Sequence, residues 1–502
     1  MTIPQYSSRK LLAFAAVALV VCSLPVFETQ FLNDMEFYSL FADKILSGRL
    51  LYRDAMDTKP PLIFLHYAAI FKLFGLNNVT AVKVVTMGWL ALSALVLVAL
   101  RKALSPDGAM PALAALVFIL GSFSGWGEEF LSSNTEILAN LFILMGIELL
   151  FAKGFTRRAA RLVAGGCCIG IACLYRYQSA VAFGAYVATV LLRWRHFDRG
   201  FRRLFTVGVG VALPAAIVIA YYVRLGAISD LRLLLAYQSH YACDPDRLSW
   251  KAVCVRMLLA TVGLWPVLVM AAGRAVEILK LRAAASPCEI FQLAFAGCSA
   301  ATFFVGRRFF AHYFVQAIPP LVLLAVQRMA PLPEPPGSSP RRRTWFVKHA
   351  LAILAVPAAM FTLINGIYYW TRKQPPPSPN LVAFVNKRSA PTDEVLLWTW
   401  RPELLFETKR AFATRLLVNE MLIGRVNPAQ ESDGHRERRP GLAELWPVYL
   451  RDLASAPPKL IFDALPGTSE WPIDCFPQLA EFLSRYQPCQ VVDDVCVYFR
   501  RD

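Results

Sequence analysis

Residues 33–64 read NDMEFYSLFADKILSGRLLYRDAMDTKPPLIF and form a long acid-bearing segment between two strongly apolar ones. Asp34, Glu36 and Tyr38 open an amphipathic pattern that predicts a short helix. Gly48 is a plausible end for that helix, because glycine is common just after a helix C-terminus. The segment therefore predicts a capped helix that carries carboxylates at its first turn, beside apolar sequence.

The turn LYRDAMDTK follows that helix and brings Asp54, Asp57 and Lys59 to a double proline at 60–61. Proline is favoured at the first position of a helix, so a new apolar helix is expected to begin there. Two readings remain open for the acids of this segment. They belong to a working site, or they decorate the exposed face of a solvated loop.

The chain has 502 residues, of which 56% are hydrophobic and only 17% charged, so it is too apolar for a soluble protein of this length. A transmembrane helix needs about 17–25 apolar residues. Eleven stretches meet this pattern, at 11–27, 79–100, 111–127, 136–152, 162–178, 180–194, 204–223, 252–279, 289–306, 312–328 and 349–370. We expect an α-helical, polytopic membrane domain over residues 1–370.

The net charge of +17 is distributed unevenly along the chain. Six short segments hold 20 Lys and Arg against 3 Asp and Glu, namely 1–10, 101–112, 153–162, 193–203, 280–288 and 328–348. This pattern follows the positive-inside rule and does not indicate nucleic-acid binding. It places the six segments in the cytoplasm, with the acid-bearing loop and the C-terminal tail outside.

The apolar run 60–74 is long enough for a short span, but a span there would invert every later loop. We therefore expect an interfacial or re-entrant helix in that place. The run Leu11 to Phe27 follows Arg9 and Lys10 without a small-residue cleavage site, which favours an uncleaved first span.

The composition changes at TRKQPPPSPN, residues 371–380, which we read as a proline-rich linker. Strand patterns follow at 394–400, 459–465 and 491–499, with amphipathic helix patterns at 441–454 and 476–486. Residues 381–502 are therefore expected to form a small α/β domain outside the membrane. Three of the cysteines, Cys475, Cys489 and Cys496, lie in this tail, and an oxidising compartment would allow any pair of them to form a disulfide.

The first loop resembles that of a known superfamily. Asp-x-x-x-Tyr, Leu-x-x-Gly, Tyr-Arg-Asp and Lys-Pro-Pro-Leu occur in order within thirty residues. This arrangement is similar to the first periplasmic loop of GT-C glycosyltransferases that use polyprenyl-phosphate sugars, such as bacterial aminoarabinose transferases of lipid A and protein O-mannosyltransferases. The resemblance implies two juxtamembrane helices in the first loop, a lipid-phosphate-linked sugar as donor, and an envelope glycolipid, polysaccharide or protein as acceptor.

The resemblance also assigns a catalytic role to Asp34, as the carboxylate that takes the acceptor's proton. Many relatives carry a second acid directly after it, where this chain has Met35, so Glu36 is the nearest substitute. Glu136, at the end of GEEFLSSNTE, corresponds to an acid that helps to form the site in relatives. The same residue also suits the N-terminal charge preference of a helix.

The departing phosphate needs cationic partners on the outer face. Arg307 and Arg308 depart from the positive-inside pattern there, and arginine suits bidentate phosphate contact. The alternative is that they snorkel to lipid headgroups. The residues expected to bind substrate are Tyr38, Tyr52, Asp54, Asp57, Lys59, Arg176, Gln178, Arg307, Arg308, His312 and Tyr313.

The sequence thus predicts an inverting glycosyltransferase of a bacterial inner membrane, with its active site and C-terminal domain in the periplasm. Two other classes compete with it. A translocator of lipid-linked sugars would carry acids deep within its spans, and an inactive scaffold would use the tail to bind a partner. No cofactor is predicted. A divalent metal is conceivable, but no ligand spacing supports one.

Overall fold

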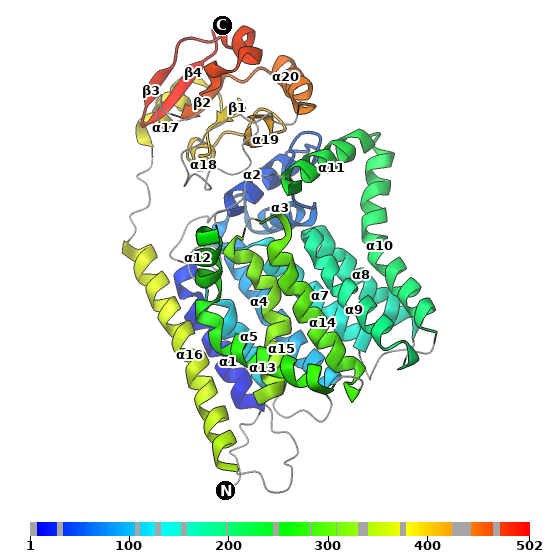
Figure 1. Ribbon diagram of the computed structural model, residues 1–502. Helices are drawn as coiled ribbons and strands as arrows, with labels where there is room; N and C mark the ends of the chain where they lie inside the picture. Colours follow the sequence, from blue (N-terminus) through cyan, green and yellow to red (C-terminus); the bar gives the residue numbers. More distant parts are fainter. Residues whose placement is uncertain are drawn as a thin grey trace.

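The computed structural model describes residues 8–27, 34–105, 111–125, 132–151, 158–196, 199–243, 250–281, 284–307, 309–329, 340–371, 378–423, 443–464 and 472–501. A bundle of helices forms its lower part, and a small sheet with short helices lies above one end of the bundle (Figure 1). The helices that span the bundle's length begin or end at the level of the first loop. This arrangement places the loop between the bundle and the sheet.

Helices occupy each of the eleven predicted spans. They are α1 (Ser8–Phe27), α4 (Val79–Leu104), α5 (Pro111–Ser122), α7 (Thr135–Phe151), α8 (Ala159–Tyr175), α9 (Val181–Leu192), α10 (Gly200–Arg224), α12 and α13 (Trp250–Thr261, Trp265–Leu281), α14 (Pro287–Ala301), α15 (Ile318–Met329) and α16 (Pro340–Thr371). Among the described residues, four helices are long and apolar enough to cross a membrane alone: Ser8–Phe27, Val79–Leu104, Gly200–Arg224 and Trp250–Leu281. Shorter apolar helices pack beside them.

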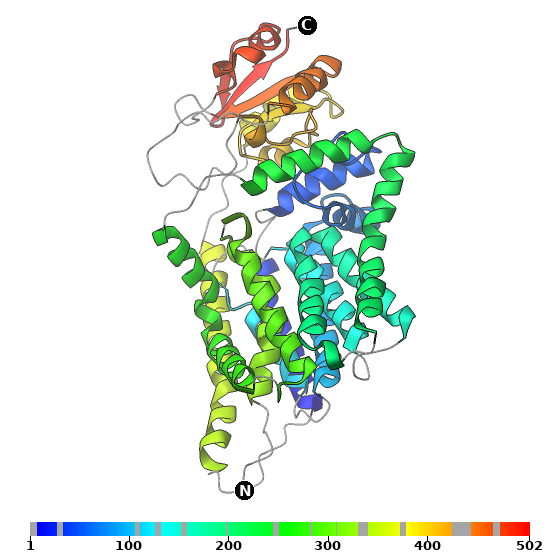
Figure 2. The ribbon, with the colours of Figure 1, turned by 45° about the vertical axis from the view of Figure 1, so that its right-hand side comes forward.

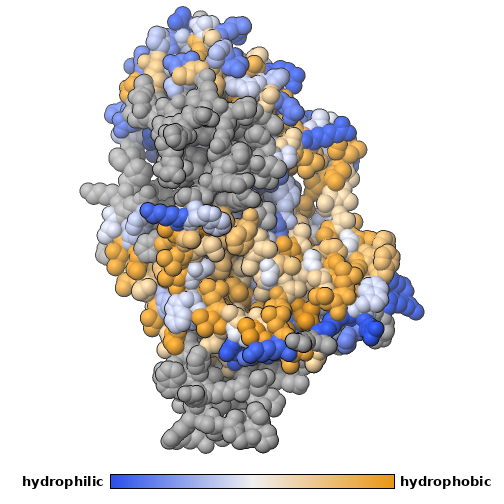
Figure 3. Space-filling model, viewed as in Figure 1, coloured by the Kyte–Doolittle hydropathy of each residue, from blue (hydrophilic) through white to orange (hydrophobic). Residues whose placement is uncertain are grey.

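The outer surface of the bundle is apolar. On the face seen in the space-filling view, a hydrophobic belt crosses the bundle, with hydrophilic residues above and below it (Figure 3). Helix α10 contributes Phe201, Phe205, Val209 and Ile217 to this exposed surface. Exposed apolar surface of this extent is stable in lipid and not in water, so the chain is a multi-pass membrane protein.

The first loop forms α2 (Asp34–Leu46) and α3 (Leu62–Phe74), which lie across the end of the bundle (Figures 1 and 2). The end of α2 has the pattern expected from its glycine: Gly48 has φ +83°, the N–H of Arg49 donates to the carbonyl of Lys44, and the N–H of Gly48 donates to that of Ile45. The interfacial helix predicted at 60–74 is present as α3. A third helix of this layer, α11 (Ile228–Cys243), was not predicted, because its sequence mixes polar and apolar residues without a clear period.

Glycines let α7, α8 and α10 approach closely. A Cβ atom at Gly146 would lie 2.8 Å from the carbonyl oxygen of Gly165, and one at Gly166 would lie 2.2 Å from that of Val207. Small residues at helix contacts are typical of membrane bundles, where close packing replaces the hydrophobic effect between helices. Since α7 and α8 are antiparallel neighbours, this contact places the start of α7 beside the end of α8.

The C-terminal part contains a four-stranded sheet of order β1-β2-β4-β3. Its strands are β1 (Val395–Trp398), β2 (Leu460–Ala464), β3 (Gln490–Val492) and β4 (Val495–Phe499), with β1 parallel to β2 and the other pairs antiparallel. Around it lie α17 (Pro379–Arg388), α18 (Glu403–Thr408), α19 (Glu420–Ile423), α20 (Leu445–Ser455) and α21 (Ala480–Leu483). Residues 372–377 of the predicted linker lie outside the described part of the chain.

Two details of the C-terminal part differ from the prediction. The single strand expected at 491–499 is a hairpin, because Asp493 and Asp494 take positive φ values of 44° and 60° and reverse the chain. The helix expected at 476–486 is reduced to α21 and a preceding 3₁₀ turn. Of the three cysteines that could pair, Cys489 and Cys496 form a disulfide across the hairpin, whereas Cys475 is exposed and does not belong to that pair.

Candidate active site

Asp34, Tyr38 and Lys59 form one cluster at the end of the bundle. Asp34 is the first residue of α2, and Tyr38 lies one turn later on the same face, so its hydroxyl donates to Asp34 Oδ2 at 3.1 Å. Lys59 Nζ lies 3.1 Å from the same Oδ2 and 5.1 Å from the centre of the Tyr38 ring. The carboxylate and the ammonium group remain partly open to solvent, with 30% and 27% of their side chains exposed.

The pKa values of this pair move apart. Burial alone would raise the pKa of Asp34, but the charges of Lys59 and His312 and the hydrogen bonds from Lys59 and Tyr38 outweigh burial and lower it. Burial alone would lower the pKa of Lys59, but the charges of Asp34 and Asp57 raise it. Asp34 is therefore ionised and able to accept a proton, and Lys59 is protonated.

The turn between α2 and α3 fixes the position of Lys59. Asp57 Oδ1 accepts the backbone N–H of Lys59 at 2.9 Å, and the hydroxyl of Tyr52 donates to the Lys59 carbonyl at 2.9 Å. Asp54 Oδ2 accepts the N–H of Leu50 at 2.7 Å. The structure shows that Asp57 binds the main chain of Lys59, while Asp34 is the partner of its ammonium group.

A second cluster lies where α7 begins and α8 ends. Glu136, in the first turn of α7, forms a buried ion pair with Arg176, which follows α8. The Arg176 guanidinium lies 4.2 Å from the centre of the Tyr313 ring, and His312 Nε2 lies 3.7 Å from Glu136 Oε1. Glu136 also accepts a hydrogen bond of 2.9 Å from the hydroxyl of Thr135. Residues from three separated segments, at 136, 176 and 312–313, therefore meet at this place.

The two clusters adjoin each other. The charge of His312 lowers the pKa of Asp34, and Tyr313 raises the pKa of Lys59. The segment 311–317 therefore adjoins both clusters. Carboxylates and cations alternate across this surface. Such an arrangement can accept a proton on Asp34 and stabilise negative charge on a leaving group beside Lys59 and Arg176.

Most of the predicted substrate residues thus lie together, with some differences. Arg176 was predicted as a candidate for phosphate contact, and in the structure it forms an ion pair with Glu136. Met35 is fully buried and contributes packing, whereas Glu36 is half-buried in the first turn of α2. Gln178 accepts a hydrogen bond through its backbone carbonyl, from Gln316 Nε2 at 3.4 Å. Arg308 and the side chain of Arg307 lie outside the described part of the chain.

The sequence did not single out the residues that support the site on its bundle side. The Tyr67 hydroxyl donates to the Ser133 carbonyl at 3.1 Å, and its ring lies 5.3 Å from that of Tyr38. Thr86 donates to the hydroxyl of Ser133 at 2.7 Å. Tyr67 lies on the same face of α3 as Phe64, which packs on Tyr38 as well. The spacing of Phe64 and Tyr67 along one face of the predicted helix was the signal that could have identified Tyr67 from the sequence.

Metal binding finds no support in the described ranges, which contain no group of three His, Cys, Asp or Glu side chains that could hold an ion. The charges of the site therefore come from side chains, and the described residues include no candidate metal centre.

Comparison with known proteins gives structural matches only. No protein-family model matches the chain, and no curated protein matches it by sequence. The crystal structure of ArnT from Cupriavidus metallidurans bound to undecaprenyl phosphate is similar over 98% of both chains, with a TM-score of 0.60 and 15% identity. The oligosaccharyltransferase AglB of Archaeoglobus fulgidus, in complex with an inhibitory peptide and a dolichol-phosphate, is similar over 92% of this chain and 70% of its own, with a TM-score of 0.52 and 13% identity. The chain thus has the fold of these two solved structures.

Proposed function

We propose that the protein is an integral-membrane, inverting glycosyltransferase that moves a sugar from a polyprenyl monophosphate carrier to an envelope acceptor. The observation that carries the proposal is the ion pair of Asp34 and Lys59, which is partly open and adjoins the Glu136, Arg176 and His312 cluster. ArnT, which has the same fold, was crystallised with undecaprenyl phosphate. A lipid-phosphate donor therefore suits both the fold and the charges of the site.

The chemistry follows from these groups. An acceptor hydroxyl or amine attacks the anomeric carbon of the donor sugar, and the bond from that carbon to the carrier phosphate breaks. Asp34 takes the proton that the acceptor loses. The released carrier phosphate keeps the bonding electrons, and Lys59 stabilises its charge. Attack opposite the leaving phosphate inverts the anomeric configuration.

Lys59 has two partners in this scheme. In the structure it contacts Asp34, but the donor phosphate carries more negative charge and draws the ammonium group towards itself. Asp34 then loses part of the field that lowers its pKa and becomes a stronger base. Donor binding would thus prepare the base for the acceptor.

The translocator alternative is less well supported. In the described parts of the spanning helices, acids lie only in terminal turns, such as Glu136 at the start of α7, Glu277 near the end of α13 and Glu289 at the start of α14. Transporters place ionisable groups near the middle of the membrane. Acids confined to the regions near helix ends favour an interfacial enzyme over a translocator.

We infer that the site and the C-terminal part face the periplasm of a bacterial inner membrane. The described ends of helices beside the basic segments, such as the end of α4 and the start of α10, lie at the opposite end of the bundle (Figure 1), as the positive-inside rule requires of cytoplasmic loops. The disulfide between Cys489 and Cys496 also suits an oxidising compartment.

The decisive experiment incubates the purified protein with radiolabelled polyprenyl-phosphate sugars and an envelope extract. Transfer of label to a glycolipid, polysaccharide or protein supports the proposal and identifies the acceptor class. If no donor of a panel of hexose and pentose carriers yields labelled product, while the protein moves labelled carrier across vesicles, the translocator reading replaces it.

A further inference from the structure

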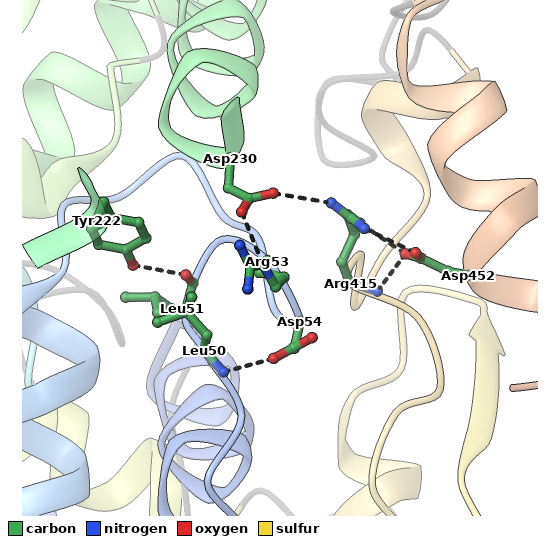
Figure 4. A network of polar contacts seen from close by, with 8 residues as sticks. All are labelled: Leu50, Leu51, Arg53, Asp54, Tyr222, Asp230, Arg415 and Asp452. Atoms are coloured by element: carbon green, nitrogen blue, oxygen red, sulfur yellow. Dashed lines mark hydrogen bonds and ion pairs between the residues drawn. The ribbon is translucent and has the colours of Figure 1, made fainter. Parts of the chain in front are cut away.

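A chain of ionic contacts connects the C-terminal part of the protein to the loop that carries Lys59 (Figure 4). Arg415, which follows β1, binds Asp452 of α20 through two hydrogen bonds of 2.8 and 2.9 Å. Its Nη1 lies 3.8 Å from Asp230 Oδ1, in the first turn of α11. The Asp230 carboxylate accepts a hydrogen bond of 3.1 Å from Arg53 Nε on its other oxygen.

Asp230 is therefore shared between two arginines that come from different parts of the chain. Only 12% of its side chain is exposed, so its contacts are shielded from solvent more than those of a surface ion pair. Arg53 lies in the turn between α2 and α3, whereas Arg415 belongs to the C-terminal part. We call Arg53, Asp230, Arg415 and Asp452 the clamp.

The main chain of Arg415 holds the same turn. The N–H of Met56 donates to the Arg415 carbonyl at 2.6 Å, and Met56 pairs with Leu416 as in a parallel strand. The hydroxyl of Tyr222, from α10, donates to the Leu51 carbonyl at 2.7 Å. The turn is thus attached on three sides, to α10, to α11 and to the C-terminal part.

This attachment determines where Lys59 lies. Tyr52 adopts φ +66°, a left-handed conformation that is unfavourable for tyrosine and persists only where its surroundings enforce it. In that conformation its hydroxyl binds the Lys59 carbonyl at 2.9 Å. The main chain from Tyr52 to Lys59 therefore extends from the clamp to the cation that contacts Asp34.

We propose that Asp230 and Arg415 are positioning residues for catalysis, through which the C-terminal part holds Lys59 against Asp34. The inference rests on the proposed function. Without the clamp, the turn relaxes at Tyr52 and Lys59 moves away from the carboxylate. Neither residue contacts Asp34, so both act through the turn.

The pH dependence of transfer distinguishes positioning from a general structural role. The groups that face Asp34 are Tyr38 from α2, Lys59 from the turn, Tyr67 from α3 and His312 from the segment before α15. Asp34 works as a base only when ionised, so kcat/KM falls as the pH drops through its pKa. If Lys59 moves away from Asp34, the pKa of Asp34 rises, and the fall in kcat/KM moves to higher pH.

The experiment measures kcat/KM against pH for the full-length protein and for Asp230→Asn and Arg415→Gln. We expect a shift of the acidic limb upward by about one unit, as for the loss of one nearby opposite charge, and therefore up to about a tenfold loss of kcat/KM at pH values below the limb of the unaltered protein. Asp452→Asn, which removes only the outer partner of Arg415, should give a smaller shift in the same direction. Glu481→Gln, in an exposed ion pair with Arg485, is the matched control and should leave the profile unchanged.

A cycle with Lys59→Ala completes the test. Lys59→Ala alone should shift the acidic limb of the kcat/KM profile to higher pH. The double variant Lys59→Ala, Asp230→Asn should have its limb at the same pH as Lys59→Ala. Thermal unfolding measured alongside identifies variants that are simply less folded. Reduced activity of Asp230→Asn and Arg415→Gln with an unchanged limb, or full additivity with Lys59→Ala, would overturn the inference. Failure of the proposed function is distinct, because the unaltered protein would then transfer no sugar at any pH.

Discussion

At the scale of single residues, Asp34 and Lys59 each compensate for the partial burial of the other. The ammonium group lowers the pKa of the carboxyl group against the effect of burial, and the carboxylate raises the pKa of the ammonium group in turn. Such a pair is stable only while both charges are present. Changing either residue therefore affects both the base and the phosphate-binding cation, in ways that kinetics can separate.

Replacing Asp34 with Asn should abolish transfer and retain carrier binding. The amide keeps the shape of the side chain but accepts no proton, and removal of a general base typically costs about 10²–10⁴-fold in rate. Turnover with a labelled donor and binding of unlabelled carrier are the two measurements. Asp43→Asn, in the same helix, is the control and should transfer at the normal rate. Normal turnover of Asp34→Asn would remove the assignment of this residue as the base.

Replacing Lys59 with Ala should weaken binding of the donor. A hydrogen bond to a charged group contributes about 1.5–3 kcal/mol, so KM for the polyprenyl-phosphate sugar should rise roughly 10–100-fold. The measurement is a carrier titration in one defined lipid composition, with Arg307→Ala and Arg308→Ala tested alongside. Lys72→Ala, in the last turn of α3, serves as the control. Unchanged carrier affinity in all three test variants would exclude a phosphate site at these residues.

At the scale of elements, glycines bring Glu136 and Arg176 together. These residues belong to the start of α7 and the end of α8, and the ends meet only if the two helices pack closely along their length. Gly146 and Gly165 permit this, since a Cβ atom at Gly165 would lie 2.9 Å from the carbonyl oxygen of Gly146. The buried ion pair therefore depends on residues that carry no charge.

Gly165→Ala tests that dependence. The added methyl group meets a backbone oxygen that cannot turn aside, so the helices must separate, at a cost of about 1–3 kcal/mol. We expect a lower unfolding temperature and a loss of transfer. Gly184→Ala is the matched control, because nothing lies within 4 Å of a Cβ atom there and alanine favours the helix. Equal stability of the two variants would show that α7 and α8 do not need the close contact.

At the scale of the whole molecule, the site lies between two parts of different character. Below it is the apolar bundle with its hydrophobic belt, and above it is the mixed sheet that contacts the first loop (Figures 1 and 3). Phe37 of α2 packs on Trp400 with ring centres 5.0 Å apart, and Lys44 binds Glu394 at 2.7 Å. The C-terminal part therefore covers the outer side of α2, and the bundle covers its inner side.

The orientation of the molecule can be tested with cysteine labelling of intact cells that have had their outer membrane removed. Cys475 is exposed in the C-terminal part and should react with a membrane-impermeant maleimide added outside. Ala160→Cys, at the opposite end of the bundle and in a Cys475→Ser background, should react only after the membrane is opened. Cys254, which is also exposed, and Cys243, at the end of α11 on the outer side, are replaced by serine in both samples. Labelling of both positions from the same side would contradict the inferred topology.

The sequence by itself determined the membrane part of the fold and the segment that carries the candidate active site. Apolar runs of the right length specify spanning helices because the bilayer leaves few alternatives, and the positive-inside pattern orients them. The helix signals of residues 33–64 are local, so α2 and α3 were predictable. Asp34, Tyr38 and Lys59 lie in that one segment, which is why they were recognised together.

Tertiary structure alone decided which charges meet. The ion pair of Arg176 with Glu136 was not predicted, because the two residues lie forty positions apart in the sequence and belong to different helical segments. The clamp could not be predicted from the sequence for the same reason, since Arg53, Asp230 and Arg415 come from three separated segments. Local patterns encode helices and turns, whose contacts span a few residues. Ion pairs between distant segments depend on how the helices pack, and only the folded chain brings those residues within reach of each other.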